Sequence, residues 1–231
     1  MKALEILQPA AFGDILFIQK LCKVLSEQYE VYHNINPMFW DRGADQLETN
    51  VNFGPNLSIP NERFVYDCSA HMKEPKDLMT SKYEGIGIEW EDWTDYLKYR
   101  RYPEREHGLR QHFGIEKGDP FILANRTYSF HKTHEGVRDT IPSDYDGKII
   151  WIEPNLTQKI FDWCWLFENA EQIHTVDTSI MFVIDTLNTT DKLYCHPRHW
   201  QNTKRAVERV FDSSWSWVDY TEESIRGKCT G

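Results

Sequence analysis

The chain has 231 residues, with 26 Lys and Arg against 36 Asp and Glu, a formal net charge of −10 at pH 7. Hydrophobic residues make up 40% and charged residues 27%, which is typical of a globular protein, and no apolar run is long enough to span a membrane. The acidic balance disfavours binding of polyanions by the field of the whole protein, although it leaves room for a local basic groove.

The N-terminal segment and the cysteines bear on the cellular compartment. Lys2 is followed by Glu5 inside the first apolar stretch, so the segment makes a poor signal peptide. The five cysteines are odd in number, widely spaced and without a C-x-x-C pair. This usage is typical of reduced thiols rather than of a disulfide framework or a zinc site, and we expect a cytoplasmic protein.

The start of the chain predicts a strand, a helix and a second strand. An apolar run at 3–8 predicts the first strand, Gly13 gives the turn its backbone freedom, and apolar residues at helical spacing predict a helix over 15–25. A second strand at 30–35 completes a βαβ unit, which implies a parallel sheet. Further strands are expected at 63–67 and 86–90. A helical stretch, interrupted by Pro103, is expected at 91–113.

A second alternation of strands and helices follows the turn residues near Gly114. Strands are expected at 120–125, 147–152, 171–176 and 192–196. Helices are expected at 157–169, with Thr157 as the cap, at 178–187 and at 201–211. The pattern predicts an α/β protein of two Rossmann-like lobes facing a cleft, at 1–113 and 114–211. We expect the segment 212–231, with Trp215 and Trp217, to pack back toward the first lobe.

Two strand-to-helix junctions carry the residues of chemical interest. Gly13 and Asp14 lie where the first helix begins, and ligands of parallel sheets bind beyond the carboxyl ends of the strands. In the second half, Asp177, Thr178 and Ser179 begin an apolar helix whose N–H groups suit a phosphate. The alternative in both places is a helix cap without a ligand. No G-x-G-x-x-G, Walker A, H-E-x-x-H or G-x-S-x-G motif occurs.

The two junctions together resemble those of one enzyme family. The stretch GDILFIQKL resembles the G-D-[VI]-[LI] element of the ADP-heptose:lipopolysaccharide heptosyltransferases, which are inverting glycosyltransferases of the GT-B fold. The stretch Leu156 to Leu187 is similar to the segment of that family that contains V-D-T/S-G near the donor site. The chain departs from the family in its short length, in Ser179 in place of Gly, and in Phe182 in place of a His.

The resemblance implies roles for individual residues. Asp14 falls on the general base that deprotonates the acceptor hydroxyl, and the second lobe would bind a nucleotide-diphosphate sugar. Donor contacts are implied for Asn125, Arg126, Thr127, Lys132, Glu153, Asp177, Thr178 and Ser179. Either Arg126 or Lys132 would neutralise the leaving diphosphate, and Glu153 would suit the ribose. On the acceptor side we expect Gly13, Lys98, Arg100 and Arg101.

Other clusters leave alternatives open. His131, His134 and Glu135 favour a solvated loop over a metal site, and the D-x-D at 144–146 lies in a turn, so no cofactor and no obligatory metal are expected. The segment 98–102 interleaves basic and aromatic residues. This pattern is typical of a groove that binds nucleic acid, and the alternative is a surface helix. The segment 196–200 follows a strand and either edges the donor pocket or forms a structural loop.

Together with the resemblance, these observations predict a metal-independent, inverting glycosyltransferase that moves a sugar to an acceptor hydroxyl, and the resemblance implies a saccharide as the acceptor. One alternative is a phage-type DNA glycosyltransferase that acts on a hydroxymethylated base, for which the segment 98–102 would bind the DNA. A second alternative is a non-catalytic nucleotide-binding module of the same fold, which the substitutions at Ser179 and Phe182 motivate.

Overall fold

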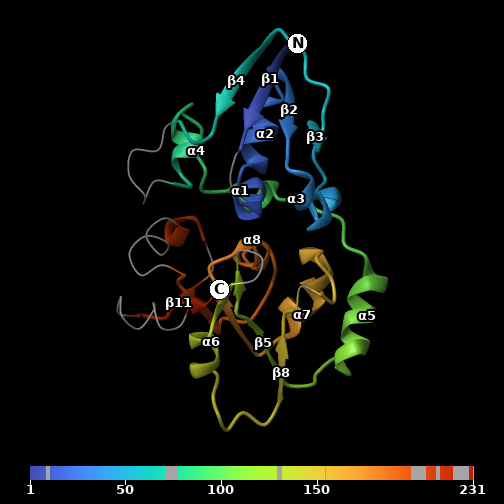
Figure 1. The fold of residues 1–231 in the computed structure, drawn as a ribbon, viewed down its shortest axis with the longest axis vertical. Helices are drawn as coiled ribbons and strands as arrows, with labels where there is room; N and C mark the ends of the chain where they lie inside the picture. Colours follow the sequence, from blue (N-terminus) through green and yellow to red (C-terminus); the bar gives the residue numbers. More distant parts are fainter. Residues whose placement is uncertain are drawn as a thin grey trace. The chain divides into compact units, whose positions relative to one another are not determined.

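The computed structural model describes residues 1–8, 11–70, 78–128, 132–153, 155–198, 207–211, 214–220 and 229–230. It divides into two compact units, Met1–Arg100 and Arg101–Gly231 (Figure 1). The boundary expected near residue 114 differs, because helix α5 (Pro103–Phe113) belongs to the second unit and packs on residues 160–169. Gly114, with a φ of 58°, is the left-handed cap of α5, so its turn signal ends a helix rather than a domain.

The first unit is built on a parallel sheet with the strand order β3-β2-β1-β4. Its strands are β1 (Lys2–Leu7), β2 (Tyr29–Asn34), β3 (Asn52–Gly54) and β4 (Arg63–Asp67). Its helices are α1 (Phe12–Phe17), α2 (Gln19–Leu25), α3 (Pro37–Asp41) and α4 (Ser81–Glu84), with the 3₁₀ turns η1 (Ala44–Gln46) and η3 (Trp93–Tyr96). The βαβ unit and its parallel pairing are as the sequence predicted.

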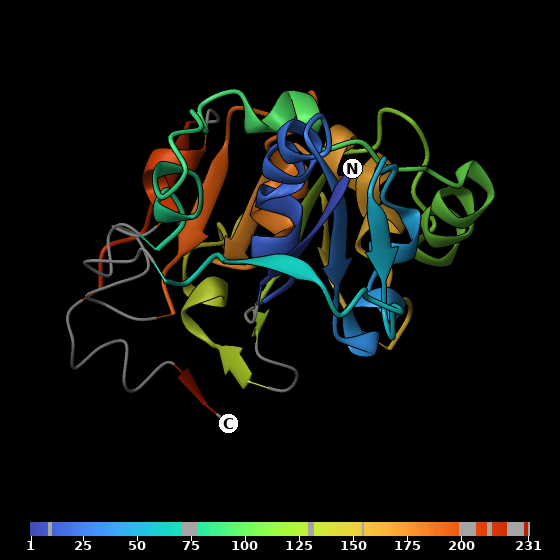
Figure 2. The same ribbon diagram turned by 90° about the horizontal axis from the view of Figure 1, so that it is seen from above.

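The helix expected over 15–25 is two helices that break at Ile18. The hydroxyl of Tyr83 donates a hydrogen bond to the carbonyl of Phe17, so this carbonyl has a partner outside the helix where the helix is interrupted. Phe17 also contacts the rings of Tyr83 and Trp93, at centroid distances of 5.1 and 5.5 Å, and all three side chains are fully buried. In the view from above, α1 and α2 lie along one side of the strands (Figure 2), and α2 packs on β2.

Three expectations in the middle of the chain need correction. Residues 86–90 do not form a strand: 86 and 87 lie in a turn, where Gly87 has a φ of 70°, and 88–90 have no regular secondary structure. In the stretch 91–113, only η3 and α5 are helical, and Pro103 begins α5 rather than interrupting a helix. The strand β3 and the helix α3 were missed because each is only a few residues long.

The second unit contains a parallel sheet with the strand order β11-β10-β9-β5-β8. Its strands are β5 (Phe121–Asn125), β8 (Lys148–Trp151), β9 (Gln172–Val176), β10 (Leu193–His196) and β11 (Trp215–Trp217). Its other helices are α6 (Gly136–Asp139), α7 (Cys164–Asn169) and α8 (Ser179–Ile184), with the turns η4 (Ile160–Trp163) and η5 (Glu208–Val210). A small antiparallel sheet joins β12 (Cys229–Thr230), β7 (Lys132–His134) and β6 (Thr127–Tyr128).

Packing in the second unit follows the apolar runs of the sequence. Phe121, Phe161 and Phe167 are fully buried, and Trp163 is buried as well. Thr157 is not a helix cap: its hydroxyl accepts from Lys159 N and donates to Asp162, and the helical turns begin at Ile160. Phe182, which stands where the resembling family has a His, is buried, and its ring lies 4.9 Å from that of Phe211.

The C-terminal segment was expected to pack toward the first lobe. Trp215 and Trp217 instead form β11, which pairs in parallel with β10, and β12 pairs with β7, so the described residues of this segment extend the sheets of the second unit. In the helix expected at 201–211, residues 201–206 lie outside the described residues and 208–210 form a 3₁₀ turn. None of the described helices has the length and apolarity needed to cross a membrane.

Candidate active site

In the first unit, the strand order diverges at β1. The chain leaves β1 toward β2 on one side, while β4 pairs with β1 on the other, and ligands of open parallel sheets bind at such points of divergence. Asp14 lies in the first turn of the helix that follows β1, and Gly13 before it is buried. The structure therefore has the predicted carboxylate at the sheet edge where its chemistry was expected.

Asp14 makes a buried ion pair with a residue that the sequence analysis missed. Lys82 Nζ lies 3.0 Å from Asp14 Oδ1, and the two side chains are only 3% and 12% exposed. Lys82 is in α4, and Tyr66 at the end of β4 donates a hydrogen bond to its carbonyl at 2.9 Å. Nothing in the sequence marks Lys82, since a lysine in a short polar stretch is usually exposed.

Several polar groups close to Asp14 or Lys82 in the sequence are buried without a hydrogen-bond partner among the described residues. They are both amide atoms of Gln8, which ends the segment after β1, and the hydroxyls of Thr80 and Ser81, which directly precede Lys82. Such groups are uncommon in folded proteins, and a bound hydroxylated molecule can satisfy them. Burial raises the pKa of the Cys68 thiol to about 12, so this nearby cysteine is not a nucleophile at neutral pH.

In the second unit the strand order diverges at β5, which lies between β8 and β9. Asn125, the last residue of β5, donates from Nδ2 to Thr175 Oγ1 at 3.0 Å and accepts at Oδ1 from Thr127 N at 3.1 Å. Its side chain is buried and engaged at both ends. Asn125 thus connects the ends of β5 and β9 and orients the residues that follow.

Two arginines lie beyond the ends of these strands. Arg126 binds both carboxylate oxygens of Glu135, at 2.8 and 2.9 Å, and its guanidinium lies 5.5 Å from the ring centre of Trp151. Arg198, after β10, lies 5.8 Å from the ring centre of Tyr128. Both rings pack in one apolar cluster with Ala124 and Val176, so the two guanidinium groups border the same end of the sheet.

Asp177 is a structural ligand of Arg198. Its Oδ1 accepts from the backbone N of Arg198 at 2.8 Å and from Nε at 3.0 Å, and the carboxylate is 2% exposed. The segment 196–200 therefore edges this site through Arg198, while residues 199 and 200 lie outside the described residues. Asp177 fixes the loop after β10.

The remaining predicted donor residues differ in accessibility. Thr178 is the N-cap residue of α8, and its buried hydroxyl has no hydrogen-bond partner in the part of the chain that the structure describes. Ser179 and Thr127 are half-buried, whereas Lys132 on β7 and Glu153 after β8 are exposed. Thr178, Ser179, Arg126 and Arg198 thus follow the ends of β9, β5 and β10, which are neighbours in the sheet.

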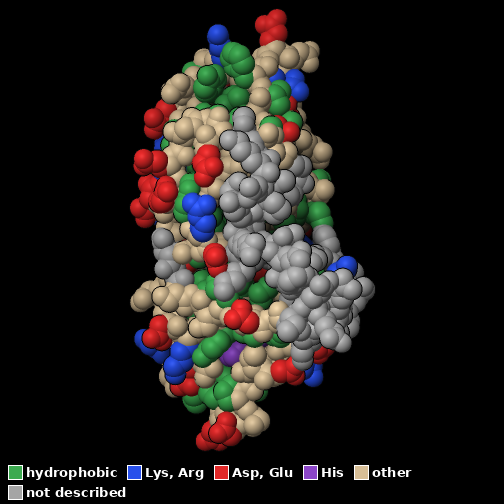
Figure 3. All heavy atoms as spheres, turned by 90° about the vertical axis from the view of Figure 1, so that its left-hand side faces the viewer, with side chains coloured by type: hydrophobic (Ala, Val, Ile, Leu, Met, Phe, Trp, Pro, Cys, Tyr) green, Lys and Arg blue, Asp and Glu red, His purple; other side chains and the backbone are tan. Residues whose placement is uncertain are grey.

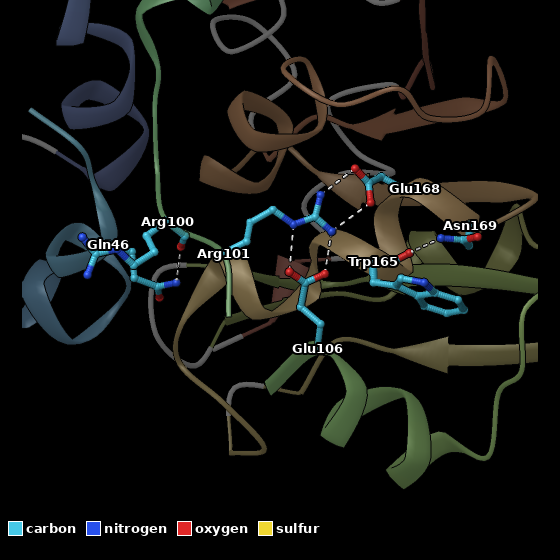
Figure 4. A network of polar contacts seen from close by, with 7 residues as sticks. All are labelled: Gln46, Arg100, Arg101, Glu106, Trp165, Glu168 and Asn169. Atoms are coloured by element: carbon cyan, nitrogen blue, oxygen red, sulfur yellow. Dashed lines mark hydrogen bonds and ion pairs between the residues drawn. The ribbon is translucent and has the colours of Figure 1, made fainter. Parts of the chain in front are cut away.

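The predicted acceptor residues at 98–101 are already paired. Arg101 forms a fork with two carboxylates, with contacts of 2.5 to 2.9 Å to Glu106 and Glu168 (Figure 4). These carboxylates raise its pKa. Arg100 lies 4.0 Å from Glu48, and its carbonyl accepts from Gln46, while Lys98 is exposed. The fork fastens α5 to α7, which is a structural role.

Three histidines gather in the second unit, on β7, β9 and β10. Thr140 Oγ1 lies 3.1 Å from His174 Nδ1 and 3.2 Å from His196 Nε2, and the ring centres of His134 and His196 are 5.9 Å apart. His134 is therefore buried and not in the solvated loop expected for it, and His131 lies outside the described residues. Burial lowers the pKa of His174 to about 4 and, with His134 and His174 adding to the effect, that of His196 to about 3. Within the described residues, no group of His, Cys, Asp and Glu is arranged to hold a metal ion.

Comparisons with known proteins identify the fold. No family model matches the sequence, and no curated protein matches it. The structure of a glycosyl transferase family 9 protein from Veillonella parvula DSM 2008 is similar over 98% of this chain and 90% of that one, with a TM-score of 0.57 at 9% identity. The structure of E. coli ADP-heptose lps heptosyltransferase II aligns over 97% of this chain and 94% of that one, with a TM-score of 0.49 at 11% identity. The chain therefore has the α/β fold of a glycosyl transferase family 9 structure, which confirms the GT-B-like fold class expected from the sequence.

Proposed function

We propose that the protein is an inverting glycosyltransferase that moves a sugar from a nucleotide-diphosphate sugar to an acceptor hydroxyl. The observation that carries the proposal is the buried Asp14–Lys82 pair at the carboxyl ends of β1 and β4, among buried polar groups without partners. Its likeness in fold to a glycosyl transferase family 9 structure supports the same reaction class.

Asp14 is the general base in this proposal. Lys82 holds Oδ1 at 3.0 Å, which leaves Oδ2 to accept the proton of the acceptor hydroxyl as its oxygen attacks the anomeric carbon. The bond from that carbon to the diphosphate oxygen breaks on the opposite face, so the configuration inverts. The buried amide of Gln8 and the hydroxyls of Thr80 and Ser81 are suited to bind the other hydroxyls of a saccharide acceptor.

The second unit stabilises the leaving nucleoside diphosphate. Arg126 and Arg198 supply the positive charge, the Thr178 hydroxyl and the backbone at Ser179 supply hydrogen bonds, and Asn125 and Asp177 hold these groups in place. Lys132 and Glu153, which are exposed, are left for the outer phosphate and the ribose. Arg126 and Arg198 are each paired with a carboxylate of the protein, Glu135 and Asp177, so the diphosphate would share their guanidinium groups, and the proposal requires no cofactor and no metal.

The charge distribution favours a saccharide over modified DNA as the acceptor. The basic residues between 98 and 110 are largely paired: Arg101 with Glu106 and Glu168, and Arg110 with Glu116. On the one face drawn in Figure 3, the coloured Lys and Arg side chains are scattered among Asp and Glu and form no continuous basic area. Binding of a phosphate backbone requires a row of available cations.

The first experiment identifies the donor by thermal shift. The protein is melted with UDP-, GDP-, ADP-, CMP- and dTDP-sugars, each in turn. A nucleotide sugar at 100 times its dissociation constant stabilises the native state by about 2.7 kcal/mol. For a chain of this size, that corresponds to a rise in Tm of roughly 5–10 °C. A protein whose Tm responds to none of these donors does not have the proposed donor site.

The second experiment tests the base. Asp14→Asn leaves the buried ammonium of Lys82 unpaired, so the matched variant is the double substitution Asp14→Asn with Lys82→Met, which removes both charges. Both variants should still bind the donor but transfer sugar about 10²–10⁴-fold more slowly, which is the usual contribution of a general base. Transfer by the folded double variant at the wild-type rate would refute the role of Asp14 as the base, whereas a wild-type protein that binds the donor and transfers no sugar would be the non-catalytic module.

A further inference from the structure

Helix α4 carries Lys82, the partner of Asp14, and is only four residues long. A single helical turn is not stable by itself, so contacts with the rest of the first unit must fix its position. Two tyrosine hydroxyls make such contacts. The hydroxyl of Tyr66, in β4, donates to the carbonyl of Lys82 at 2.9 Å. The hydroxyl of Tyr83, in α4 itself, donates to the carbonyl of Phe17 at 2.5 Å, which joins α4 to the helix that contains Asp14.

The Tyr83 hydroxyl meets this helix where α1 ends and α2 begins. Just before the break, Ile18 N donates to Asp14 O at 3.1 Å, as in a regular helix. The Tyr83 hydroxyl then bonds to two backbone groups, the carbonyl of Phe17 and the backbone of Leu21. A continuous helix joins the carbonyl and the N–H of two residues at this spacing directly, because they are four positions apart. The hydroxyl is therefore inserted into the hydrogen-bond ladder at the break between α1 and α2.

The side chain of Tyr83 is enclosed at this place. It is fully buried, and its ring lies 5.1 Å from that of Phe17 in an edge-to-face contact. Burial raises the pKa of the Tyr83 hydroxyl well above its ordinary value, although the hydrogen bond from the backbone of Leu21 lowers it, so the group stays protonated and donates at neutral pH. A buried donor that lost its acceptor would be left unsatisfied, which keeps the bond from α4 to α1 in place.

We propose that Tyr83 is a positioning residue for the sugar transfer, whose hydroxyl fastens α4 to α1 and so holds Lys82 against Asp14. Lys82 directly precedes Tyr83, so the bond restrains the backbone from which the Lys82 side chain extends. Phe17 ends the six-residue helix in which Asp14 occupies the first turn, so the same bond restrains the base. This inference rests on the proposed function, and it adds a residue that touches neither substrate.

The first test is the rate of transfer by Tyr83→Phe, which removes the hydroxyl and keeps the ring. The carbonyl of Phe17 and the N–H of Leu21 can then bond to each other as in a continuous helix, so the variant should fold, which far-UV circular dichroism and Tm verify. With α4 released from α1, kcat should fall about ten- to a hundredfold, the effect of displacing a reacting group by up to about 1 Å. Donor binding should stay unchanged, because the proposed donor groups lie in the second unit.

A matched control is Tyr32→Phe in the same unit. The Tyr32 hydroxyl bonds to Glu30 on its own strand, β2, and not to a helix of the candidate site. This variant loses the same atom as Tyr83→Phe, and its kcat should change by less than about twofold, because it displaces no reacting group.

A double-mutant cycle distinguishes positioning from a general loss of structure. Tyr83→Phe is also made in the variant that carries Asp14→Asn and Lys82→Met, in which there is no ion pair to position. If Tyr83 acts through this pair, its substitution should slow the residual transfer there by less than about twofold, so the effects are not additive. A merely structural effect would give the same fold loss in both backgrounds.

The outcomes for Tyr83 and for the proposed function are separable. Transfer by Tyr83→Phe at the wild-type rate, an equal fold loss in both backgrounds, or a Tyr83→Phe chain that does not fold would each overturn the positioning role and leave the proposed function standing. A wild-type protein that transfers no sugar from any of the nucleotide sugars would refute the proposed function, and the role of Tyr83 with it.

Discussion

The two units contain the same kind of junction but use it differently. In each, an aspartate follows a central parallel strand and meets a basic residue: Asp14 with Lys82, and Asp177 with Arg198. Asp177 accepts two hydrogen bonds from one loop residue, and Asn125 beside it is satisfied at both ends of its amide. Asp14 has a single close charge, and the side chains of Gln8, Thr80 and Ser81 in the first unit lack partners among the described residues, as does the Thr178 hydroxyl next to Asp177 in the second unit.

This difference distinguishes side chains that hold their neighbours in place from side chains that remain able to bind or react with a substrate. A polar network whose members all have partners is rigid, and its energy is fully used in the fold. Buried polar atoms without partners cost free energy, and a protein that keeps them retains a place for something else to bind. The proposed reaction therefore places the proton transfer in the first unit and the holding of the donor in the second.

The largest effect is expected from removal of a counter-ion in the first unit. Lys82→Met leaves the Asp14 carboxylate buried without a compensating charge, which costs about 3–5 kcal/mol of unfolding free energy. The double variant with Asp14→Asn should regain most of this loss, because no charge is then buried. Urea denaturation monitored by tryptophan fluorescence measures both values.

The equivalent substitution in the second unit is the matched control. In Arg198→Met, the backbone N of residue 198 can still donate to Asp177, and the replaced side chain was 28% exposed. The expected loss is therefore smaller, about 1.5–3 kcal/mol. Equal losses in Lys82→Met and Arg198→Met would show that the two junctions are energetically alike, against the comparison drawn above.

Acidification should also distinguish the units. The lowered pKa values of His174 and His196 mean that the unfolded chain, with ordinary values near 6.5, takes up protons that the folded chain refuses. Stability is therefore fully present above pH 6.5 and falls as the pH decreases toward 4. Because the unfolded His is half protonated at pH 6.5, each His loses about 1 kcal/mol between pH 6.5 and 5.5, so the second unit should lose about 2 kcal/mol over this interval. Asp139, near His196, acts in the opposite sense.

Hydrogen exchange of peptides from each unit measures this difference. The first unit contains one comparable group, His33, whose pKa burial lowers to about 4, so its loss over the same interval should be about half as large. Replacement of both His174 and His196 by Gln should flatten the pH dependence of exchange in β9 and β10 and leave that of β1 and β2 unchanged. A first unit that loses protection at a higher pH than the second would contradict the expectation.

The sequence predicted the parts of the fold that repeat a pattern. Apolar runs were enough for β1, β2, β5, β9 and β10, which are central strands of their sheets, and also for the edge strands β4 and β8. The short β3 and the hairpin β6–β7 carry no such pattern. They form because of neighbours far away in the sequence, as in the pairing of Asn52 with Tyr32.

For each of the two ion pairs in the candidate site, the sequence predicted only one of the two residues. Asp14 and Asp177 could be found because they lie at strand-to-helix junctions. Lys82 and Arg198 contact them across 68 and 21 positions of the chain (82 − 14 and 198 − 177), and no local pattern predicts such contacts. For the same reason Arg101, which suggested an acceptor contact, is instead held by Glu168, on a helix distant in the sequence.

The smallest effect, and the sharpest test of the comparison, is expected from a single hydroxyl in each unit. Thr80→Val removes a buried hydroxyl without a hydrogen-bond partner among the described residues, so stability should stay equal or rise by up to about 1 kcal/mol. Thr175→Val removes a hydroxyl that binds Asn125, and should cost about 1–3 kcal/mol. If the Thr80 hydroxyl binds the acceptor, Thr80→Val should also slow sugar transfer while it leaves donor binding unchanged. If Thr80→Val destabilises the protein as much as Thr175→Val does, the Thr80 hydroxyl has a structural partner. It would then no longer support an acceptor site at this end of the first sheet.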